Sequence, residues 1–557
     1  MPNQPLKAYQ EDRQERGIYD QRNSLNDLTG KEWLFSTKTI IPKSYPKDLP
    51  SSTISSKTVL LPVQLRRELI ETFTKPNERI LDPFFGSELT LLAGNSTNQG
   101  SSRPAREIIG IKNSQNSVVQ FKDLLTSLNI NSSSSLKYES ENYLKKLSKE
   151  SIDFIISDLQ IYDTDLETES HLEDISWLSS WLEVFKSRLI QSVSLLKDNR
   201  YFVISLPFKD HSVVSDPKLI DERNFALIPT ITSLFDSIGC ILKAERFWFE
   251  PSNKESQLLL IPPKRRILVF RKEKSTASKN AATQKTSPVT RLRGQTFIHH
   301  KSYPPSFEHK IRSLHGGMKP PELMDFLIRR YSTDLADLVF DPFVGVGGTL
   351  LGASLSNRSA FGIDQNPKWR EIYKEVCSRM KIDSHRYLVG DSRLIIDSSV
   401  SDGSLGLIMT DVPYWAMDKL AKTRGRFSKA GEQSKDKLHS SLKKFDHSEI
   451  LSIEEWQNLM KDVFSTCYKK LGDGKRLVVF IGNMYRTLTE VHNGKTVKVG
   501  RFLLLASMLA ELLVSIGYHF LEEVVWYAPD KALHIFGYPY SYIPSVVHQD
   551  ILVFEKQ

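Results

Sequence analysis

Residues 340–353 read FDPFVGVGGTLLGA, a glycine-rich stretch that follows an apolar run. An apolar run ends at Asp341, and Gly345, Gly347 and Gly348 then precede a helical pattern. Glycines permit a tight turn with positive φ and a close approach of the backbone to a ligand. The N–H groups that open the following helix are then free to face that ligand. The stretch predicts a strand, a turn and a helix that form a ligand-binding loop, although a purely structural turn also uses glycines.

The same loop is written a second time at residues 81–94, LDPFFGSELTLLAG, where Glu88 and Leu89 replace two glycines. Further segments match in the same order: IIGIKN (108–113) with AFGIDQN (360–366), IDFIISDLQIY (152–162) with LGLIMTDVPYW (405–415), and RILVFRK (266–272) with DILVFEK (550–556). The offset changes slightly along the chain, from 345 − 86 = 259 at the loop glycines to 411 − 158 = 253 at the aspartates. Loop insertions between elements of fixed order produce such a drift, so the sequence predicts a tandem duplication.

The chain has 557 residues, too many for one hydrophobic core. We predict a polar N-terminal segment at 1–29, a first domain at 30–271, a Ser-, Thr-, Lys- and Ala-rich linker at 272–297, and a second domain at 298–557. In each half, short apolar strands alternate with helical patterns, which predicts a mostly parallel, doubly wound α/β sheet with ligands at the carboxyl ends of the strands. The last two strands lack an intervening helix, so we expect an antiparallel hairpin at the sheet edge.

Composition narrows the function classes. Lys+Arg 75 against Asp+Glu 66 gives a net charge of +9, which suits a polyanionic partner such as nucleic acid but is not specific to one. The three cysteines form no CxxC pair, which argues against a zinc site or a disulfide framework and favours a reducing cytoplasm. The N-terminus lacks the apolar region of a secretory signal, and no apolar run reaches the roughly 18 residues of a membrane span.

Two further acids follow strands in the second half. Asp364 ends the segment SAFGID, where an acid bonds the ribose hydroxyls in nucleoside-binding sheets of this kind. Asp391 follows the next strand, where it is placed to accept from an adenine amino group. Either aspartate alone fits a helix cap or a turn equally well. Together with the glycine loop, the acids at successive strand ends predict a nucleoside pocket.

The stretch LGLIMTDVPYW (405–415) indicates the reaction. A buried strand runs into Asp411, Pro413 and Tyr414, which suits methylation of the exocyclic amino group of a base. The lone pair of that nitrogen is delocalised into the ring. An acceptor such as Asp411, with the adjacent backbone carbonyl, draws the nitrogen toward sp³ geometry. Tyr414 is suited to stack on a flipped base, and Pro413 stiffens the turn. The alternative is a strand-end turn with an aromatic plug.

These motifs carry a resemblance to a known family. DPFVGVGG, the preceding HGGMKPPELMDFLI, TDVPYW and the C-terminal segments resemble the S-adenosylmethionine-dependent DNA amino-methyltransferases of the N6-adenine and N4-cytosine type, over roughly residues 300–557. The resemblance implies two tandem Rossmann-like class I methyltransferase domains, with S-adenosyl-L-methionine as cofactor and no metal. It implies catalytic roles for Asp411, Pro413 and Tyr414, and cofactor contacts from Lys319, Asp341, Phe343, Gly345, Gly347, Asp364 and Asp391. Val412 stands where the family has a first proline, and the target base stays open.

Basic residues follow the catalytic motif at once, in residues 416–450. We expect a loop that folds onto phosphates when nucleic acid binds, the alternative being a solvated loop without a partner. The candidate nucleic-acid-binding residues are Trp415, Lys422, Arg424, Arg426, Lys443 and Lys444.

The first half keeps the order of strands and helices but lacks most of the side chains that would bind cofactor or substrate. Glu88 and Leu89 replace glycines, Lys112 replaces Asp364, and Gln160 and Ile161 replace the proline and tyrosine. Asp158 alone survives. We therefore expect a half that binds no cofactor, packs against the active half and supplies nucleic-acid contact surface.

The sequence thus predicts a cytoplasmic DNA methyltransferase, nucleoid-associated if the protein is bacterial, acting on cytosine N4 or adenine N6. A restriction endonuclease or another defence-system partner would fit such an enzyme. Two alternatives remain: an RNA enzyme such as a tRNA guanine-N2 methyltransferase, and a nucleic-acid-binding protein without turnover. The sequence does not give the recognition site or the oligomeric state.

Overall fold

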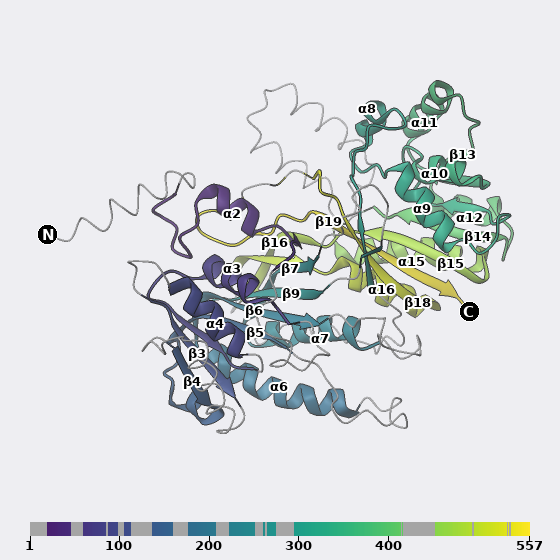
Figure 1. Cartoon of the computed structure of the whole chain (residues 1–557). Helices are drawn as coiled ribbons and strands as arrows, with labels where there is room; N and C mark the ends of the chain where they lie inside the picture. The colour runs from purple at the N-terminus through teal and green to yellow at the C-terminus, as the bar shows by residue number, and fades with distance from the viewer. Residues whose placement is uncertain are drawn as a thin grey trace.

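The structure is a computed structural model of the chain. It describes residues 19–45, 60–84, 87–98, 105–112, 136–159, 176–207, 222–250, 260–261, 264–273, 295–413, 415, 452–492, 495–531, 533 and 536–557. Two β-sheets, one from each half of the sequence, form the centres of two lobes (Figure 1).

The sheet of the first half has eight strands. Its order is β4 (Leu136–Ser140), β3 (Glu107–Lys112), β2 (Arg79–Asp82), β5 (Ile152–Asp158), β6 (Leu196–Pro207), β9 (Arg265–Lys272), β7 (Cys240–Phe249) and β1 (Ile40–Pro42). Only β9 runs antiparallel to its neighbours, and β1 lies parallel to β7 at the edge. Every residue of β5 is buried, as expected for a central strand covered on both faces.

The sheet of the second half has nine strands. Its order is β13 (Arg386–Val389), β12 (Ala360–Asp364), β11 (Val339–Asp341), β14 (Leu405–Asp411), β15 (Leu471–Ile481), β19 (His548–Lys556), β18 (Tyr518–Tyr527), β10 (Gln295–His299) and β8 (Leu260–Ile261). The ninth strand, β8, is contributed by the first half of the chain and pairs antiparallel with β10.

The two sheets therefore repeat one strand order, and the expected fold class, two tandem doubly wound α/β domains of the Rossmann-like kind, is confirmed. The correspondence extends to irregularities: the register shifts between Leu242 and Ala244 of β7, and between Phe520 and Glu522 of β18. The expected antiparallel pair forms between β18 and β19, and β10 and β8 continue the sheet beyond it. The domain boundaries stay a prediction; β10 begins at Gln295, inside the range assigned to the linker.

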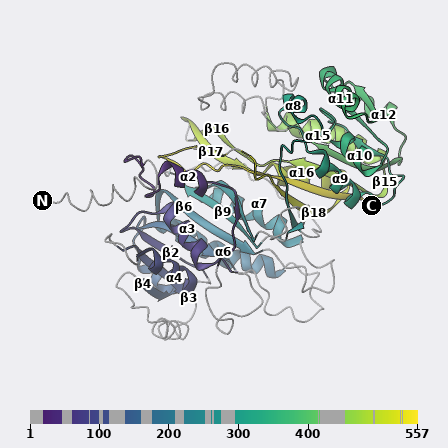
Figure 2. The same ribbon diagram turned by 45° about the horizontal axis from the view of Figure 1, so that its top comes forward.

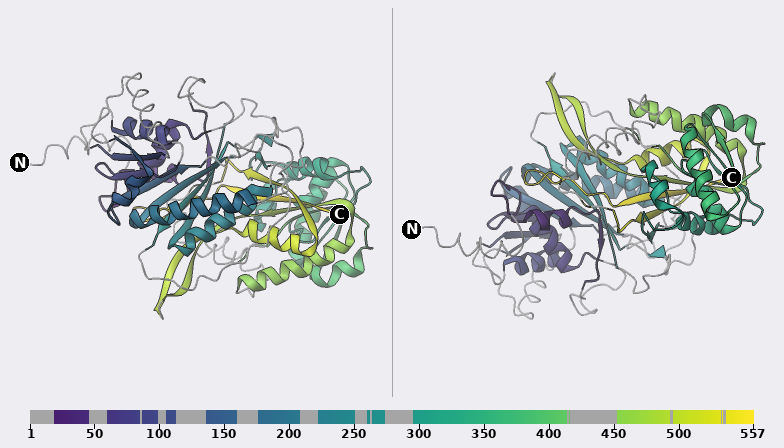
Figure 3. Two further views of the ribbon diagram at one scale, coloured as in Figure 1. Left: turned by 90° about the horizontal axis from the view of Figure 1, so that it is seen from below. Right: turned by 90° about the horizontal axis from the view of Figure 1, so that it is seen from above.

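Helices cover both faces of each sheet (Figures 1 and 3). In the first half these are α3 (Val63–Phe73) and α4 (Ser87–Asn98) on one face, and α6 (Ser176–Leu195) and α7 (Glu222–Ser237) on the other; α2 (Gly30–Ser36) and η1 (Glu141–Lys146) complete it. In the second half they are α9 (Pro321–Tyr331), α10 (Gly348–Ser356) and α11 (Pro367–Met380) opposite α12 (Ser392–Ser399), α15 (Ile453–Lys470) and α16 (Leu505–Ile516), with the short α8 (His309–Arg312) and η5 (Ser313–His315). Among the described helices, none is both long and apolar enough to cross a membrane.

A hairpin of β16 (Met484–His492) and β17 (Lys495–Leu503) follows β15 in the chain and precedes α16. It projects from the body of the molecule (Figures 2 and 3). Its base belongs to both lobes. Lys243 of β7 donates to the carbonyl of Gly500, and Arg501 forms an ion pair with Asp236 of α7. Phe502 is buried in the core of the first half. The hairpin thus ties the second half to the first.

A buried polar cluster joins the two sheets through side chains of β7 and β9 in the first and of β18, β19 and the residues after β15 in the second. Arg266 on β9 lies 2.9 Å from the carboxylate of Glu523 and 3.3 Å from that of Glu245. Asn483 donates to Glu245 at 3.1 Å and to Asp550 at 2.9 Å. All five side chains are buried. The contact is therefore an internal interface in which one guanidinium and one amide meet three carboxyl groups, and burial raises the pKa of Glu245 and of Asp550.

The exchange of strands at this interface is reciprocal. Residues 37–39, just before β1, hydrogen-bond to Ser545 and Val547 of the second half, and Thr39 pairs its hydroxyl with Nδ1 of His548 at 2.9 Å. In the other direction β8 pairs with β10. In each half, the segment between the last two strands thus contacts the other half, either on its first strand or directly before it.

Candidate active site

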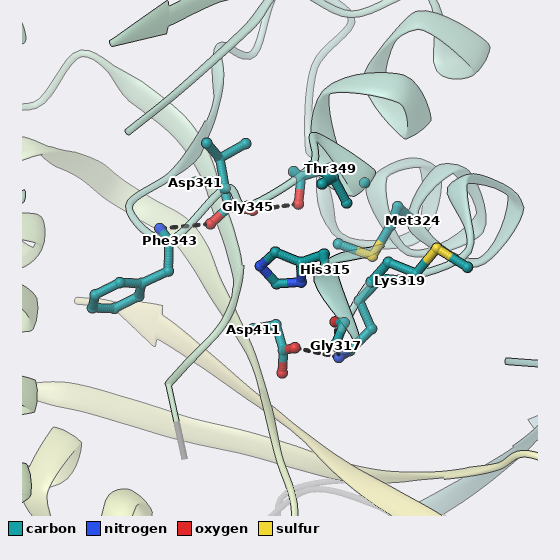
Figure 4. A pocket seen from close by; sticks show the side chains of 13 residues that line it. His315, Gly317, Lys319, Met324, Asp341, Phe343, Gly345, Thr349 and Asp411 are labelled. Carbon is teal, nitrogen blue, oxygen red and sulfur yellow. Dashed lines mark hydrogen bonds and ion pairs between the residues drawn. The ribbon is translucent and has the colours of Figure 1, made fainter. Parts of the chain in front are cut away.

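A pocket lies at the carboxyl ends of β11 and β14, between the glycine loop and the start of α9 (Figure 4). It is small and partly open: the centres of water-sized molecules could occupy about 40 Å³ of it. Its lining residues are His315, Gly317, Met318, Lys319, Met324, Asp341, Phe343, Val344, Gly345, Val346, Gly348, Thr349 and Asp411. Five of the residues predicted from the sequence, Lys319, Asp341, Phe343, Gly345 and Asp411, therefore come together here.

Asp341 ends β11 and lies at the floor of the pocket, almost fully buried. It accepts hydrogen bonds from the hydroxyls of Thr349 and Thr410, both at 2.6 Å, and from the backbone N–H of Phe343 at 2.9 Å. Burial outweighs these three bonds and raises the pKa of Asp341 to about 7. The carboxyl group is thus fixed in place, and a nearby positive charge would favour its ionised form.

The loop after β11 depends on glycine at two positions. Gly345 has φ 48°, and a Cβ there would lie 2.8 Å from Nε2 of His315. Gly347 has φ 77° and caps α10, and a Cβ there would lie 2.3 Å from the ring of Tyr373. Any other residue at either position would be strained and would clash. The glycines are therefore required by the packing around the loop, in addition to any role toward a ligand.

Asp364 supports this loop from the end of β12. Its carboxylate accepts from the backbone N–H of Gly345 at 3.1 Å and of Asn366 at 2.8 Å. Burial raises its pKa to about 6. Tyr387 donates to the carbonyl of Gly345 at 2.7 Å. The sequence placed Asp364 correctly at a strand end; its ribose contact stays a prediction.

Asp411 ends β14 and forms an ion pair with Nζ of Lys319, which lies just before α9 (Figure 4). The lysine is almost buried, whereas 19% of the Asp411 side chain is exposed. The centroids of the Phe480 and Trp526 rings lie 5.5 and 6.0 Å from Nζ.

His315 also lines the pocket. Burial and the positive charges of Lys319 and Arg312 lower the pKa of His315 to about 3, so this imidazole is neutral.

The turn after Asp411 is anchored in the core. Val412, at the position of the family's first proline, is buried in the cluster beneath α15, and the carbonyl of Pro413 accepts from the indole of Trp456 at 2.8 Å. Trp415 packs against the same cluster. Its contact with nucleic acid stays a prediction.

Asp391 caps α12 and pairs with the guanidinium of Arg393 at 2.6 Å. It does not line the pocket, so its contact with an adenine stays a prediction. Several predicted residues lie outside the described part of the chain: Tyr414, Lys422, Arg424, Arg426, Lys443 and Lys444. Gln160 and Ile161 of the first half also lie outside it, as do the side chains of Glu88 and Lys112.

The equivalent place in the first half is filled by two arginines. Asp82 and Asp158 end β2 and β5, as Asp341 and Asp411 end β11 and β14. Arg66 of α3 donates to Asp158 and, at 2.9 Å, to Thr90; Arg265 of β9 donates to the other oxygen of Asp158. All of these side chains are fully buried. Asp158 therefore has a structural role, which the sequence did not predict.

Arg66 occupies the position that Met324 holds in the second half. Both are the fourth residue of an eleven-residue helix that follows a proline cap. The first site thus balances two aspartates with two arginines. In the second site, the charged side chains that line the pocket are Asp341, Asp411 and Lys319. Two carboxylates there face one cation, whereas two arginines face the two carboxylates of the first site. The second pocket is therefore suited to a ligand that brings a positive charge.

Comparison with known proteins identifies relatives of the chain. A family model described as a DNA methylase matches residues 3–123, 138–375 and 405–557. No curated protein sequence matches. Among solved structures, TrmN from Thermus thermophilus is similar at 14% identity and a TM-score of 0.28, over 56% of this chain and 60% of that one. Haemonchus contortus phosphoethanolamine N-methyltransferase 2 in complex with S-adenosyl-L-methionine matches at 12% identity and a TM-score of 0.24, over 84% of this chain and 98% of that one.

The two equivalent aspartates should respond differently to removal of their charge. Asp158→Asn leaves Arg66 and Arg265 buried without their shared carboxylate, and we expect a loss of about 3–5 kcal/mol in the free energy of unfolding. Asp411→Asn should cost less than about 2 kcal/mol, because Asp411 is partly exposed and pairs with one lysine, whereas Asp158 is fully buried between two arginines. Urea unfolding followed by circular dichroism measures both. Equal losses would contradict the structural role of Asp158.

Proposed function

This chain belongs to the DNA methylase family, and on that premise we propose that it transfers a methyl group from S-adenosyl-L-methionine to the exocyclic amino group of a base in DNA. The base is cytosine, at N4, or adenine, at N6. The observation that carries the proposal is the meeting of Asp411 and the Gly345 loop in one pocket, because a hydrogen-bond acceptor then lies beside the turn that we expect to bind the nucleoside of the donor.

The charges of the pocket support the methyl donor. S-adenosyl-L-methionine supplies an electrophilic methyl group on a positively charged sulfur. The pocket contains two carboxylates, Asp341 and Asp411, and one ammonium, Lys319. A cationic ligand would therefore supply the positive charge that Arg66 supplies in the first half. The residues that would hold the donor are those of the loop 341–348, with Asp364 behind it.

Asp411 would accept a hydrogen bond from the amino group of the target base. That bond draws the nitrogen lone pair out of conjugation and orients it, which lowers the barrier to transfer. The backbone carbonyl of Val412 is the candidate acceptor for the second hydrogen. Two contacts fix this segment, the packing of Val412 in the core and the bond from Trp456 to the Pro413 carbonyl. A valine in place of the first proline therefore keeps the turn anchored.

The deciding experiment supplies the purified full chain with S-adenosyl-L-methionine labelled in its methyl group. Duplex DNA and tRNA are offered separately, and the labelled nucleoside is identified by mass spectrometry. We expect N4-methylcytosine or N6-methyladenine from DNA, and no label with Asp411→Ala. Label in tRNA alone would replace the proposal with an RNA enzyme, and donor binding without label in either would indicate a protein without turnover.

Met324→Arg should copy the arginine of the first half into the active pocket. The guanidinium would pair with Asp411 or Asp341 and occupy the space of the donor, so we expect S-adenosyl-L-methionine to bind at least about 100-fold more weakly. Met324→Leu, which nearly conserves volume, is the matched control. Calorimetry measures donor binding and circular dichroism confirms folding. Similar affinities in the two variants would contradict the charge-balance argument.

Donor binding should depend on pH through Asp341. Its pKa of about 7 lies above the usual value for an aspartate, so much of the free protein carries a proton there below neutrality. A bound cation favours the carboxylate, lowers this pKa and releases the proton. We therefore expect weaker binding at pH 5.5 than at pH 7.5, and proton release at pH 6.5 when calorimetry is run in buffers of different ionisation enthalpy. Unchanged affinity with no proton release would refute this expectation.

A further inference from the structure

Lys319 is the cation that Asp411 meets in this pocket. Its backbone is rigidly held, since Pro320 and Pro321 follow it and its carbonyl accepts from Arg312 at 2.6 Å. Its side chain is almost buried, and its ammonium also lies 3.4 Å from the carbonyl of Gly317. Both residues of the ion pair line the pocket, so the pair is part of the site (Figure 4).

The surroundings restrict where this ammonium can go. The rings of Phe480 and Trp526 flank it, and such rings attract a cation without offering a carboxylate. In the part of the chain that the structure describes, Asp411 is the one carboxylate within ion-pair distance of Lys319. The lysine is therefore directed at the residue that we assign to the amino group.

The first half shows how a purely structural version of this contact is built. There Asp158 receives a guanidinium on each of its oxygens, from Arg66 and Arg265, and the backbone N–H of Leu61 as well. Leu61 occupies the position of Lys319, directly before the proline cap of the helix. In the second half Lys319 binds one oxygen, Oδ2, while Asp411 stays partly exposed.

We propose that Lys319 is a positioning residue for Asp411: its ammonium binds Oδ2, keeps the carboxylate ionised and fixes its orientation toward the amino group of the target base. The proposal rests on the proposed function and deepens it, because the resemblance to the family implies only a cofactor contact for this lysine. The charged and titratable groups around the pair are Asp341 on β11, His315 and Arg312. Without Lys319, the negative charge of Asp411 would lie near the carboxyl group of Asp341 and would lose the ammonium that now pairs with it.

The test compares Lys319→Met and Lys319→Arg in the full chain. We expect the methionine variant to lose about 100-fold in kcat, as misplacement of a reacting group does. The acid limb of its kcat–pH profile should move up by about one pH unit, because an opposite charge has been removed from a carboxylate. Its Kd for S-adenosyl-L-methionine, measured by calorimetry, should not rise, because the loss of a positive charge from the pocket does not disfavour a cationic donor. The arginine variant keeps the charge and should restore both the acid limb and most of kcat.

A double variant and a titration complete the test. In an Asp411→Asn background, Lys319→Met should cost less than about threefold more, because residues that act as a unit are not additive. Carbon-13 NMR of the aspartate carboxyl groups, assigned with Asp411→Asn, should show Asp411 titrating at higher pH in Lys319→Met. This reading needs no turnover, so it separates the proposal from failure of the proposed function. A large loss of donor affinity with an unmoved acid limb and titration would overturn it and make Lys319 a donor contact alone.

Discussion

The structure depends on how each half compensates two carboxylates, buried or largely buried, at the ends of adjacent parallel strands. Removing an aspartate from water costs several kcal/mol unless cations or hydrogen bonds replace the lost hydration. The first half meets this need internally, with Arg66 and Arg265 around Asp158. The second half meets it with hydroxyls around Asp341 and one lysine at Asp411. One sheet topology therefore gives a sealed core in one copy and an open pocket in the other.

Much of the fold could be predicted from the sequence, because the repeated order of strand, turn and helix is a local pattern. The loop at 340–353, the strand ends at Asp364 and Asp411 and the antiparallel pair β18–β19 follow from such patterns. Patterns of this kind also told the two copies apart, through the glycines that the first loop lacks.

The partners of the charged groups could not be predicted in this way. Arg66 lies 92 positions from Asp158, and Lys319 lies 92 positions from Asp411, so only the packed sheet brings them together. A helix arginine gives no sign in sequence that it will be buried against a strand end. The exchange of β8 onto β10, and the hairpin of β16 and β17 reaching the first lobe, are likewise products of packing between the halves.

The buried cluster around Arg266 has a consequence for self-recognition. Glu245 and Glu523 are equivalent in register, each opposite a leucine of the neighbouring strand, and Arg266 is equivalent to Asp550. The first half thus brings a guanidinium where the second brings a carboxylate. Two second halves docked in the same way would bury Glu523 and Asp550 against their own copies, four acids with no guanidinium. Like-charge repulsion of that kind penalises wrong partners by several kcal/mol. The asymmetry makes the joined pair specific and discourages the active half from pairing with itself.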